Sequence, residues 1–418
     1  MSGRDRGVLV VTLFYRPEPN FITADVAEAA ARGGRVTVIT AHPNYPLGHF
    51  YPGTRWWRPE RRVENGVVVW RVPMFPDHSA SPLRRAVSYL SFTLAATLLA
   101  PFVAGRPRVV WVYQTPFTVA VAALWFKVVC RSRLVYTSAD LWPESFAATG
   151  VTRPGPLMRL LYATRRALNR VADVIVGSTT GIVETYAADG VPPERMKLIR
   201  VWVDGSPRGG ALPAPPSAPV ADVPTVVYAG NLGPAQGLDV VVRGAAELKR
   251  RGVAVRFDLY GSGGAEDELR ALAAELGADN VAFHGRVPPA QAVAASAAAA
   301  AQLVVLRPSP LFDMTVPSKL PFAIGMGTPL LCGLRGESAR VAAESGGAYL
   351  FDPTDAASMA DATERVLVLD PAGRAAARER LLAYYRASLD PERLVAEYME
   401  LLGVGEPPRG VAAPPPAG

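Results

Sequence analysis

The chain has 418 residues, 50% of them hydrophobic, which is more than one hydrophobic core usually holds, so we expect two domains. Residues 1–200 carry 25 Lys and Arg against 13 Asp and Glu, whereas residues 201–418 carry 19 against 24. The basic first half favours a phosphate-rich ligand or an anionic membrane as partner, although an Arg- and Ala-rich composition alone also produces this asymmetry, and the scattered basic residues argue against nucleic acid.

Apolar runs alternate with helical segments through the first half. Strands are expected at 8–14, 35–40, 67–72, 109–113, 134–137 and 174–177, and helices at 24–31, 87–104, 119–130 and 157–172. Continuous apolar strands separated by helices are typical of a parallel sheet. We therefore predict a doubly wound, Rossmann-like α/β domain over residues 1–204.

The longest apolar segment, residues 87–104, lies at the lower limit of length for a bilayer span. The segments on both sides of it belong to the same predicted α/β domain. We therefore interpret it as a buried or surface-associated helix rather than a transmembrane one.

A Pro-rich segment at residues 205–224 predicts a semi-rigid linker. A second α/β domain is expected over 225–389, with strands at 225–229, 256–260, 281–283, 303–306 and 329–332. The Ala-rich stretch 290–301 predicts a helix packed closely on the sheet. A final amphipathic helix within 390–402 is expected to pack back on the first domain, followed by a disordered tail at 403–418. Two such domains on a hinge predict a cleft between them.

The segment 315–331 predicts a short helix that starts at Pro317 and Ser318 and ends at Gly325 and Gly327, with a buried strand beyond. The unpaired N–H groups at a helix start favour an anion, so Lys319 beside them is a candidate contact for a diphosphate. An ordinary surface lysine is the alternative, and in either case we do not expect the side chain to be buried.

Two Gly-rich loops follow strands of the second domain, at Gly230–Gly237 and Gly261–Gly264. Glycine allows a ligand to approach the backbone closely, and Asn231 and Gln236 offer neutral hydrogen-bond donors. The first loop has neither the spacing of a dinucleotide fingerprint nor that of a phosphate-binding P-loop. Together with Lys319 they predict one anion-binding site.

Other polar residues leave alternatives open. Asp140 and Glu144, after a strand, either hold a substrate or cap the next helix, and His42 contacts an acceptor or only supports its loop. His284 acts as a base or caps a loop. The four histidines (His42, His49, His78, His284) lack metal spacing, and Cys130 and Cys332 are too few for disulfides, so we predict no metal and a reducing cytosol. The N-terminus leaves no room for a signal peptide.

Several of these motifs together resemble family 4 retaining glycosyltransferases of the two-domain GT-B fold, in particular the subgroup that builds O-antigen and colanic-acid-type polysaccharides. The resemblance rests on Gly230–Leu238, Gly261–Gly264, His284–Val287, Val316–Leu320, His42–Pro46 with Gly48, Asp140–Glu144 with Gly150, and Val201–Asp204. It covers roughly residues 8–385. It implies two Rossmann-like domains that face each other across a cleft, the first for the acceptor and the second for a nucleotide-diphosphate sugar.

The resemblance also implies site residues. The implied donor site comprises Gly230, Asn231, Gly233, Gln236, Gly261, Ser262, Gly263, Arg286, Val287, Ser318, Lys319 and Phe322. The implied acceptor site comprises His42, Asn44, Tyr45, Trp142 and Glu144, and the implied catalytic residues are Lys319 and Asp140. No side-chain nucleophile is assigned, in keeping with front-face attack by the acceptor hydroxyl.

The chain departs from the family at several positions. Phe322 and Met314 stand where the family usually carries glutamates, the first of which holds the donor's ribose. Pro19–Thr23 replaces a Gly-rich loop, and Gly33-Gly34 replaces the common Gly-His. Because a phenyl ring cannot accept a hydrogen bond from a ribose hydroxyl as a carboxylate does, nucleotide recognition here is expected to be weaker or differently arranged.

The resulting prediction is a metal-independent retaining hexosyltransferase that uses a UDP-sugar as co-substrate, without a further cofactor. The acceptor is a polyprenyl-diphosphate-linked glycan, and the protein is cytoplasmic and peripheral on the inner face of the membrane. Trp56-Trp57, among Arg55, Arg58, Arg61 and Arg62, and the 87–104 helix suit an anionic interface. The alternatives are glycosylation of a secondary metabolite, as in natural-product biosynthesis, and a silent nucleotide-binding homologue that assists a partner enzyme.

Overall fold

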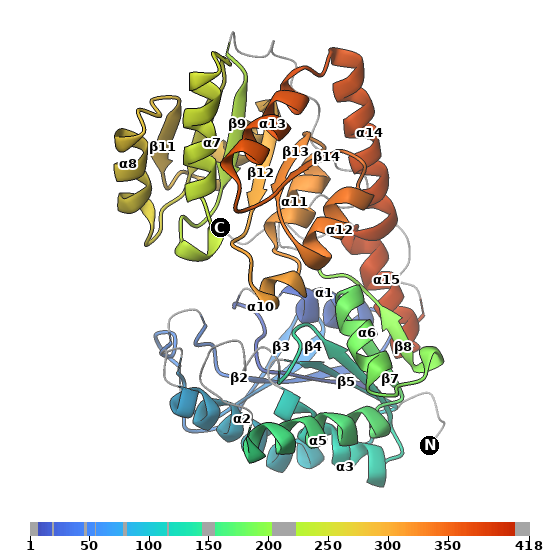
Figure 1. Ribbon diagram of the computed structural model, residues 1–418. Helices are drawn as coiled ribbons and strands as arrows, with labels where there is room; N and C mark the ends of the chain where they lie inside the picture. The colour runs from blue at the N-terminus through green and yellow to red at the C-terminus, as the bar shows by residue number, and fades with distance from the viewer. Residues whose placement is uncertain are drawn as a thin grey trace. The chain divides into compact units, whose positions relative to one another are not determined.

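The computed structural model describes residues 7–18, 21–45, 48–54, 56–77, 82–114, 117–143, 155–202 and 223–405. The chain divides into two compact units, Met1–Asp204 with Glu392–Gly418, and Gly205–Pro391 (Figure 1). Most of the predicted linker at 205–224 and of the predicted tail at 403–418 lies outside the described residues, as do Glu144, His78 and Arg55.

The first unit is built on one twisted sheet. Its strands are β1 (Val8–Thr12), β2 (Val36–Ala41), β3 (Glu60–Glu64), β4 (Val67–Val72), β5 (Val109–Gln114), β6 (Arg133–Ser138), β7 (Val174–Gly177) and β8 (Met196–Leu198). They lie in the order β3-β4-β2-β1-β5-β6-β7-β8, and only the β3–β4 pair is antiparallel. Every residue of β1 and β2 is buried, as expected for apolar strands covered on both faces.

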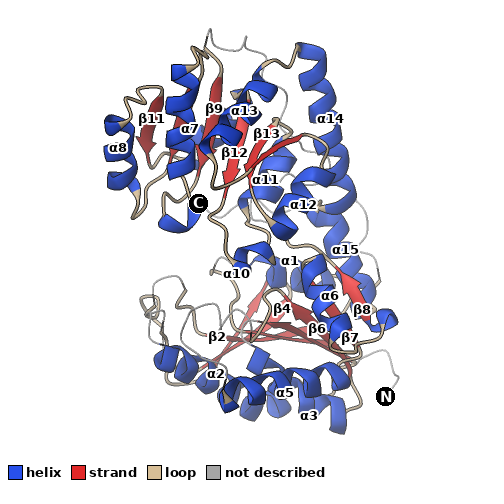
Figure 2. Cartoon of the chain, in the orientation of Figure 1, coloured by secondary structure: helices blue, strands red, loops and turns tan. Residues whose placement is uncertain are grey.

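Helices cover both faces of this sheet (Figure 2). They are α1 (Phe21–Ala31), α2 (Pro82–Val103), α3 (Val121–Val129) after the 3₁₀ turn η1 (Phe117–Ala120), α5 (Pro156–Val171), α6 (Thr180–Ala188) and the 3₁₀ turn η2 (Pro193–Arg195). Helices α2, α3 and α5 lie on one face, and α1 lies on the other. Among the described residues, the segment Arg84–Val103 of α2 is the one helix that has the length and hydropathy of a membrane span.

The last helix of the chain, α15 (Pro391–Leu402), belongs to the core of the first unit. Its buried apolar side chains are Leu394, Tyr398, Met399, Leu401 and Leu402, each at most 8% exposed. The Tyr398 ring lies 5.0 Å from that of Trp111, and Thr137 Oγ1 donates to the Tyr398 hydroxyl over 3.3 Å. Trp111 and Tyr398, which lie far apart in the sequence, thus share one core.

The second unit has a parallel sheet in the order β11-β10-β9-β12-β13-β14. Its strands are β9 (Thr225–Ala229), β10 (Arg256–Tyr260), β11 (Val281–Gly285), β12 (Ala301–Val305), β13 (Leu330–Gly333) and β14 (Ala348–Phe351). Its helices are the 3₁₀ turn η3 (Pro234–Gln236), α7 (Asp239–Arg250), α8 (Glu266–Glu275), α9 (Pro289–Ala298), α10 (Pro310–Asp313), α11 (Lys319–Met326), α12 (Gly336–Glu344), α13 (Ala356–Leu367) and α14 (Pro371–Ser388).

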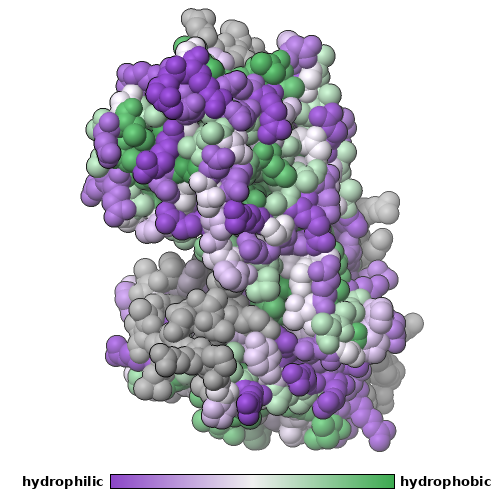
Figure 3. Space-filling view, in the orientation of Figure 1, coloured by the Kyte–Doolittle hydropathy of each residue, from purple (hydrophilic) through white to green (hydrophobic). Residues whose placement is uncertain are grey.

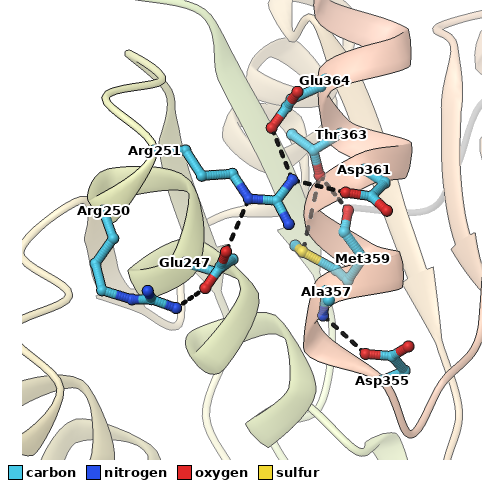
Figure 4. A network of polar contacts seen from close by, with 9 residues as sticks. All are labelled: Glu247, Arg250, Arg251, Asp355, Ala357, Met359, Asp361, Thr363 and Glu364. Carbon is cyan, nitrogen blue, oxygen red and sulfur yellow. Dashed lines mark hydrogen bonds and ion pairs between the residues drawn. The ribbon is translucent and has the colours of Figure 1, made fainter.

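A charged network joins α7 to α13 at the surface of the second unit (Figure 4). Arg251 bonds to Glu247 over 2.8 Å, to Asp361 over 2.6 Å and to Glu364 over 2.9 Å. Exposed ion pairs contribute little to stability, so the apolar core below them holds the two helices together. Hydrophilic residues dominate this side of the unit in Figure 3.

Some sequence predictions were wrong in detail. Helix α9 ends at Ala298 instead of Ala301, but it packs closely against β9 as predicted, with Ser296 as its one fully buried side chain. Gly325 lies inside α11, where Tyr385 leaves no room for a Cβ, and the helix ends instead at Gly327 with φ +70°. Strands β3, β8 and β14 were not predicted.

Candidate active site

Three loops meet at the carboxyl edge of the second sheet. The strands β9, β10 and β11 are parallel neighbours, so their following loops leave the sheet side by side. Gly230 N donates to Tyr260 O over 2.9 Å, Gly261 N donates to Gly285 O over 2.7 Å, and Leu232 N donates to Ser262 O over 3.0 Å. The backbone itself therefore joins the two predicted Gly-rich loops to the end of β11.

The contact between these loops requires glycine. A Cβ on Gly261, which has φ +130°, would lie 1.8 Å from the carbonyl oxygen of Gly230. A Cβ on Gly263 would lie 2.4 Å from the carbonyl carbon of Leu232. At Gly264, by contrast, a Cβ would meet nothing within 4 Å. The first two glycines are needed for loop packing, and the third is free to change.

Lys319 occupies the first position of α11, beside the loop after β9. Its Nζ donates to the Tyr228 hydroxyl and, over 2.5 Å, to Oε1 of Gln236. The ammonium lies 4.4 Å from the centre of the Tyr228 ring, and a Cβ on Gly230 would lie 2.3 Å from Lys319 Cε. The lysine is thus half-buried and held in place by these contacts.

Burial lowers the pKa of Lys319 to about 8, because the charged form loses solvation. In the described part of the chain its ammonium contacts neutral oxygens and an aromatic ring, and no carboxylate pairs with it. A partly desolvated cation without a counter-charge is costly to the folded protein. Such a cation is suited to an anionic ligand that supplies the missing charge.

The other predicted donor residues surround this cation unevenly. The hydroxyl of Tyr228 donates to the backbone oxygen of Asn231 over 2.7 Å, and Asn231 is exposed. Arg286 Nε donates to Ser262 Oγ over 2.6 Å, linking the loop after β11 to that after β10. Gly233 is buried, Val287 and Phe322 are half-buried, and Ser318 is exposed and makes no capping hydrogen bond with α11.

His284 has partners that favour a supporting role. Its ring stacks on Tyr260 at 4.4 Å between centroids, with an interplanar angle of 13°. Its Nε2 lies 3.1 Å from Oδ1 of the buried Asp258, which also binds Arg256. Of the two alternatives left open by the sequence, the geometry favours a residue that organises the loop over a base.

In the first unit, a buried carboxylate that the sequence analysis missed holds the loop after β2. Glu18 Oε1 accepts hydrogen bonds from the backbone N–H groups of Asn44 and Tyr45, each over 2.8 Å. Burial raises the pKa of Glu18, while these backbone donors act in the opposite direction. Its position between Pro17 and Pro19 was the only available signal, since nothing in the spacing relates it to a loop 26 residues later.

Two residues predicted to contact the acceptor are too deeply buried to do so. His42 and Asn44 are both fully buried. Asn44 Nδ2 donates to His42 O over 2.8 Å, so the amide supports the loop instead of facing a ligand. His42 Nε2 lies 3.0 Å from Arg58 O, and burial lowers the pKa of its imidazole. Tyr45 is 39% exposed and remains accessible.

Asp140 and Trp142 follow β6 at the carboxyl edge of the first sheet. Burial raises the pKa of the Asp140 carboxyl, and no basic group acts in the opposite direction. Trp142 lies edge-on to Tyr89 at 6.2 Å, and its carbonyl accepts from Arg165 over 3.1 Å. Within the described residues, no group of three or more His, Cys, Asp or Glu could hold a metal ion.

Comparisons with known proteins agree with this geometry. Residues 20–202 match the family described as a glycosyl transferase 4-like domain, and residues 223–368 match glycosyl transferases group 1. The putative colanic acid biosynthesis glycosyl transferase WcaI of Escherichia coli K12 is 27% identical over 293 residues, which are 66% of this chain and 70% of WcaI.

Solved structures share the fold across both units. Anabaena Alr3699/HepE, in complex with UDP, superimposes with a TM-score of 0.64 at 16% identity. The match covers 95% of this chain and 99% of Alr3699/HepE. WaaG, a glycosyltransferase involved in lipopolysaccharide biosynthesis, superimposes with a TM-score of 0.59 at 18% identity. The match covers 95% of this chain and 100% of WaaG. At these identities the comparison shows the fold alone.

Proposed function

The chain belongs to the family 4 glycosyltransferases of the GT-B fold, and on that premise we propose that it transfers a sugar from a UDP-sugar, with retention, to a lipid-linked glycan. The observation that carries this proposal is Lys319, a half-buried ammonium that no carboxylate of the described chain neutralises. Structural neighbours bound to UDP and UDP-glucose support the donor class. The likeness to WcaI supports polysaccharide biosynthesis.

In the proposed reaction, the bond between the anomeric carbon and the diphosphate breaks, and the diphosphate leaves with the electron pair. The acceptor hydroxyl attacks from the same face and passes its proton to the departing oxygen. Lys319, held by Tyr228 and Gln236, stabilises the charge that develops on the diphosphate without reorganising. We propose no metal and no further cofactor.

The proposed acceptor is carried on polyprenyl diphosphate and binds the basic first unit. Tyr45, Trp142 and the partly desolvated Asp140 lie in loops that follow strands β2 and β6, where ligands of parallel sheets bind. Asp140 is proposed to accept a hydrogen bond from the acceptor hydroxyl and so orient it, while the proton itself passes to the departing oxygen. A small-molecule acceptor is the alternative within the same chemistry.

A silent nucleotide-binding homologue is the second candidate, and Phe322 favours it. This half-buried side chain on α11 has no oxygen to accept a hydrogen bond from a ribose. We expect Phe322→Glu to tighten UDP binding if only ribose recognition has drifted. Unchanged UDP affinity in this variant would mean that the ribose lies elsewhere.

Calorimetry of the full chain with a panel of nucleoside diphosphates tests the function. We expect one nucleotide, UDP, to bind, and Gly261→Ala to weaken its binding at least about tenfold because its Cβ displaces the neighbouring loop. The matched control, Gly264→Ala, should bind UDP normally, since its Cβ meets open space. If no nucleotide binds and no UDP-sugar is hydrolysed, the enzymatic proposal is wrong.

The binding of UDP should depend on pH through Lys319. Its pKa of about 8 in the free protein rises when the diphosphate binds, so above pH 8 binding takes up a proton. We expect Kd to rise about tenfold per pH unit above pH 8, while the phosphate, with a second pKa of about 6, stays fully ionised. Calorimetry in buffers of different ionisation enthalpy measures this proton uptake.

The control is Lys319→Arg, because arginine stays charged over this whole range. Its UDP affinity should be lower than that of the natural protein at pH 7 but constant as the pH rises. The same slope in both proteins would assign the titration to another group.

A further inference from the structure

Helix α2 exposes its larger apolar side chains and buries its smaller ones. The buried stripe contains Ser88, Thr93, Ala96 and Ala100, with Phe92 as its one large member. The opposite stripe contains Val87, Leu90, Leu94, Leu98 and Phe102, which are 46, 57, 62, 63 and 87% exposed. A helix that serves only the core of its own domain shows the reverse pattern, with large apolar residues inside and polar residues outside.

Helix α3 repeats this pattern beside α2. It buries Ala122, Ala123 and Phe126 and exposes Val121, Trp125, Val128 and Val129, which are 42, 40, 75 and 60% exposed. The two helices pack against each other, and Thr93 Oγ1 donates to Thr118 Oγ1 over 3.0 Å where they meet. We call the nine exposed side chains of the two helices the α2–α3 face.

The α2–α3 face is large for a protein without a partner. Single exposed apolar residues are common, but monomeric proteins rarely expose a contiguous patch of more than about 600 Å². Nine large apolar side chains on two adjacent helices, each at least 40% exposed, are more than such single residues. Something apolar is therefore expected to cover this face.

The charge around the face indicates what covers it. Residues 78–173, which contain α2, α3 and α5, include twelve Lys and Arg against three acidic residues, Asp140, Glu144 and Asp173, the last of which pairs with Lys127. Arg84 and Arg85 lie in the first turn of α2, and neither α2 nor α3 contains a carboxylate. An apolar stripe with cations at its border matches the acyl chains and anionic headgroups of a lipid bilayer.

We propose that the α2–α3 face docks the protein on an anionic membrane, with both helices lying in the plane of the interface. A second copy of the chain would bring two basic surfaces together, which costs energy. A membrane-spanning α2 would have to leave the sheet, where Phe92 and Ala96 are fully buried. This inference deepens the proposed function, since it places the first unit where a lipid-linked acceptor is presented.

Co-sedimentation of the full chain with vesicles tests the proposal without nucleotide or acceptor. We expect binding to vesicles of phosphatidylcholine mixed with phosphatidylglycerol and weak binding to phosphatidylcholine alone. Leu94→Asp combined with Leu98→Asp should lower the binding at least about tenfold, because it places two carboxylates in the apolar layer. Both positions are solvent-exposed, so the variant should fold and keep its UDP affinity.

A matched pair of valines provides the control. Val128 in α3 and Val368 after α13 are 75 and 80% exposed, but Val368 belongs to the second unit. Val128→Asp should weaken vesicle binding, and Val368→Asp should not. The proposal would be overturned if the two variants had equal effects, or if the protein bound both vesicle types equally. It would also be overturned if the protein bound no vesicles but formed a dimer that depends on Leu94. None of these outcomes affects the UDP-binding test of the proposed function.

Discussion

Lys319→Ala is expected to slow sugar transfer, because the transition state loses about 2–4 kcal/mol of stabilisation. That is the usual cost of removing one charge contact at a developing anion. Lys319 is half-buried and has no carboxylate partner in the described chain, whereas Arg286, the other such cation at the site loops, is exposed. The measurement is kcat/KM with a defined UDP-sugar. Lys319→Arg should restore only part of the rate, because a planar fork replaces a compact charge.

The free energy of unfolding should change little in Lys319→Ala. The variant loses the packing of the lysine chain on Gly230, but it also removes a desolvated charge, and these two effects oppose each other. Lys249→Ala is the control, since that ammonium is 47% exposed and pairs with Asp279. Full activity of Lys319→Ala would show that the diphosphate binds elsewhere.

Tyr398→Ala should destabilise the first unit by about 3–5 kcal/mol, the range for large aromatic side chains removed from a core. Tyr398 is 2% exposed, lies against Trp111 and Trp202, and accepts a hydrogen bond from Thr137. Denaturant unfolding followed by tryptophan fluorescence measures the loss, because both tryptophans are in that core.

Glu400→Ala in the same helix is the control, since Glu400 is exposed. It should stay within about 0.5 kcal/mol of the natural protein. Because the second unit has its own core, UDP binding by Tyr398→Ala should survive at denaturant concentrations that unfold the first unit. An equal loss in both variants would mean that α15 does not support the core.

The strands were predictable where their apolar runs are continuous. β7 and β9 begin and end at the residues expected, because both faces of those strands are covered and every position is apolar or small. β3 was not predicted because its residues Glu60–Glu64 are mostly charged. It forms a strand through its antiparallel pairing with β4, which the local sequence does not reveal. The long helix α2 begins earlier than its apolar run, at Pro82.

The candidate site was predictable only in part. Lys319 and the glycine loops follow strands, so their meeting at one sheet edge can be inferred from topology. Tyr228 was missed because a tyrosine inside a strand looks like a core residue, and only the structure shows that its hydroxyl holds the ammonium. Asn44 was misassigned because a motif identifies a loop but carries no information on which side chains the loop buries.

Because β1 and α15 share one core, the two units cannot fold in the order in which they are synthesised. The second unit is one continuous segment, Gly205–Pro391, and can fold as soon as that segment has left the ribosome. The first unit must wait for Leu394–Leu402, although its sheet is translated first. At elongation rates of about 5–20 residues per second, this delay of about 200 residues lasts on the order of 10–40 s. During that time the pocket that α15 fills, around Trp111 and Trp202, stays open to water and to chaperones.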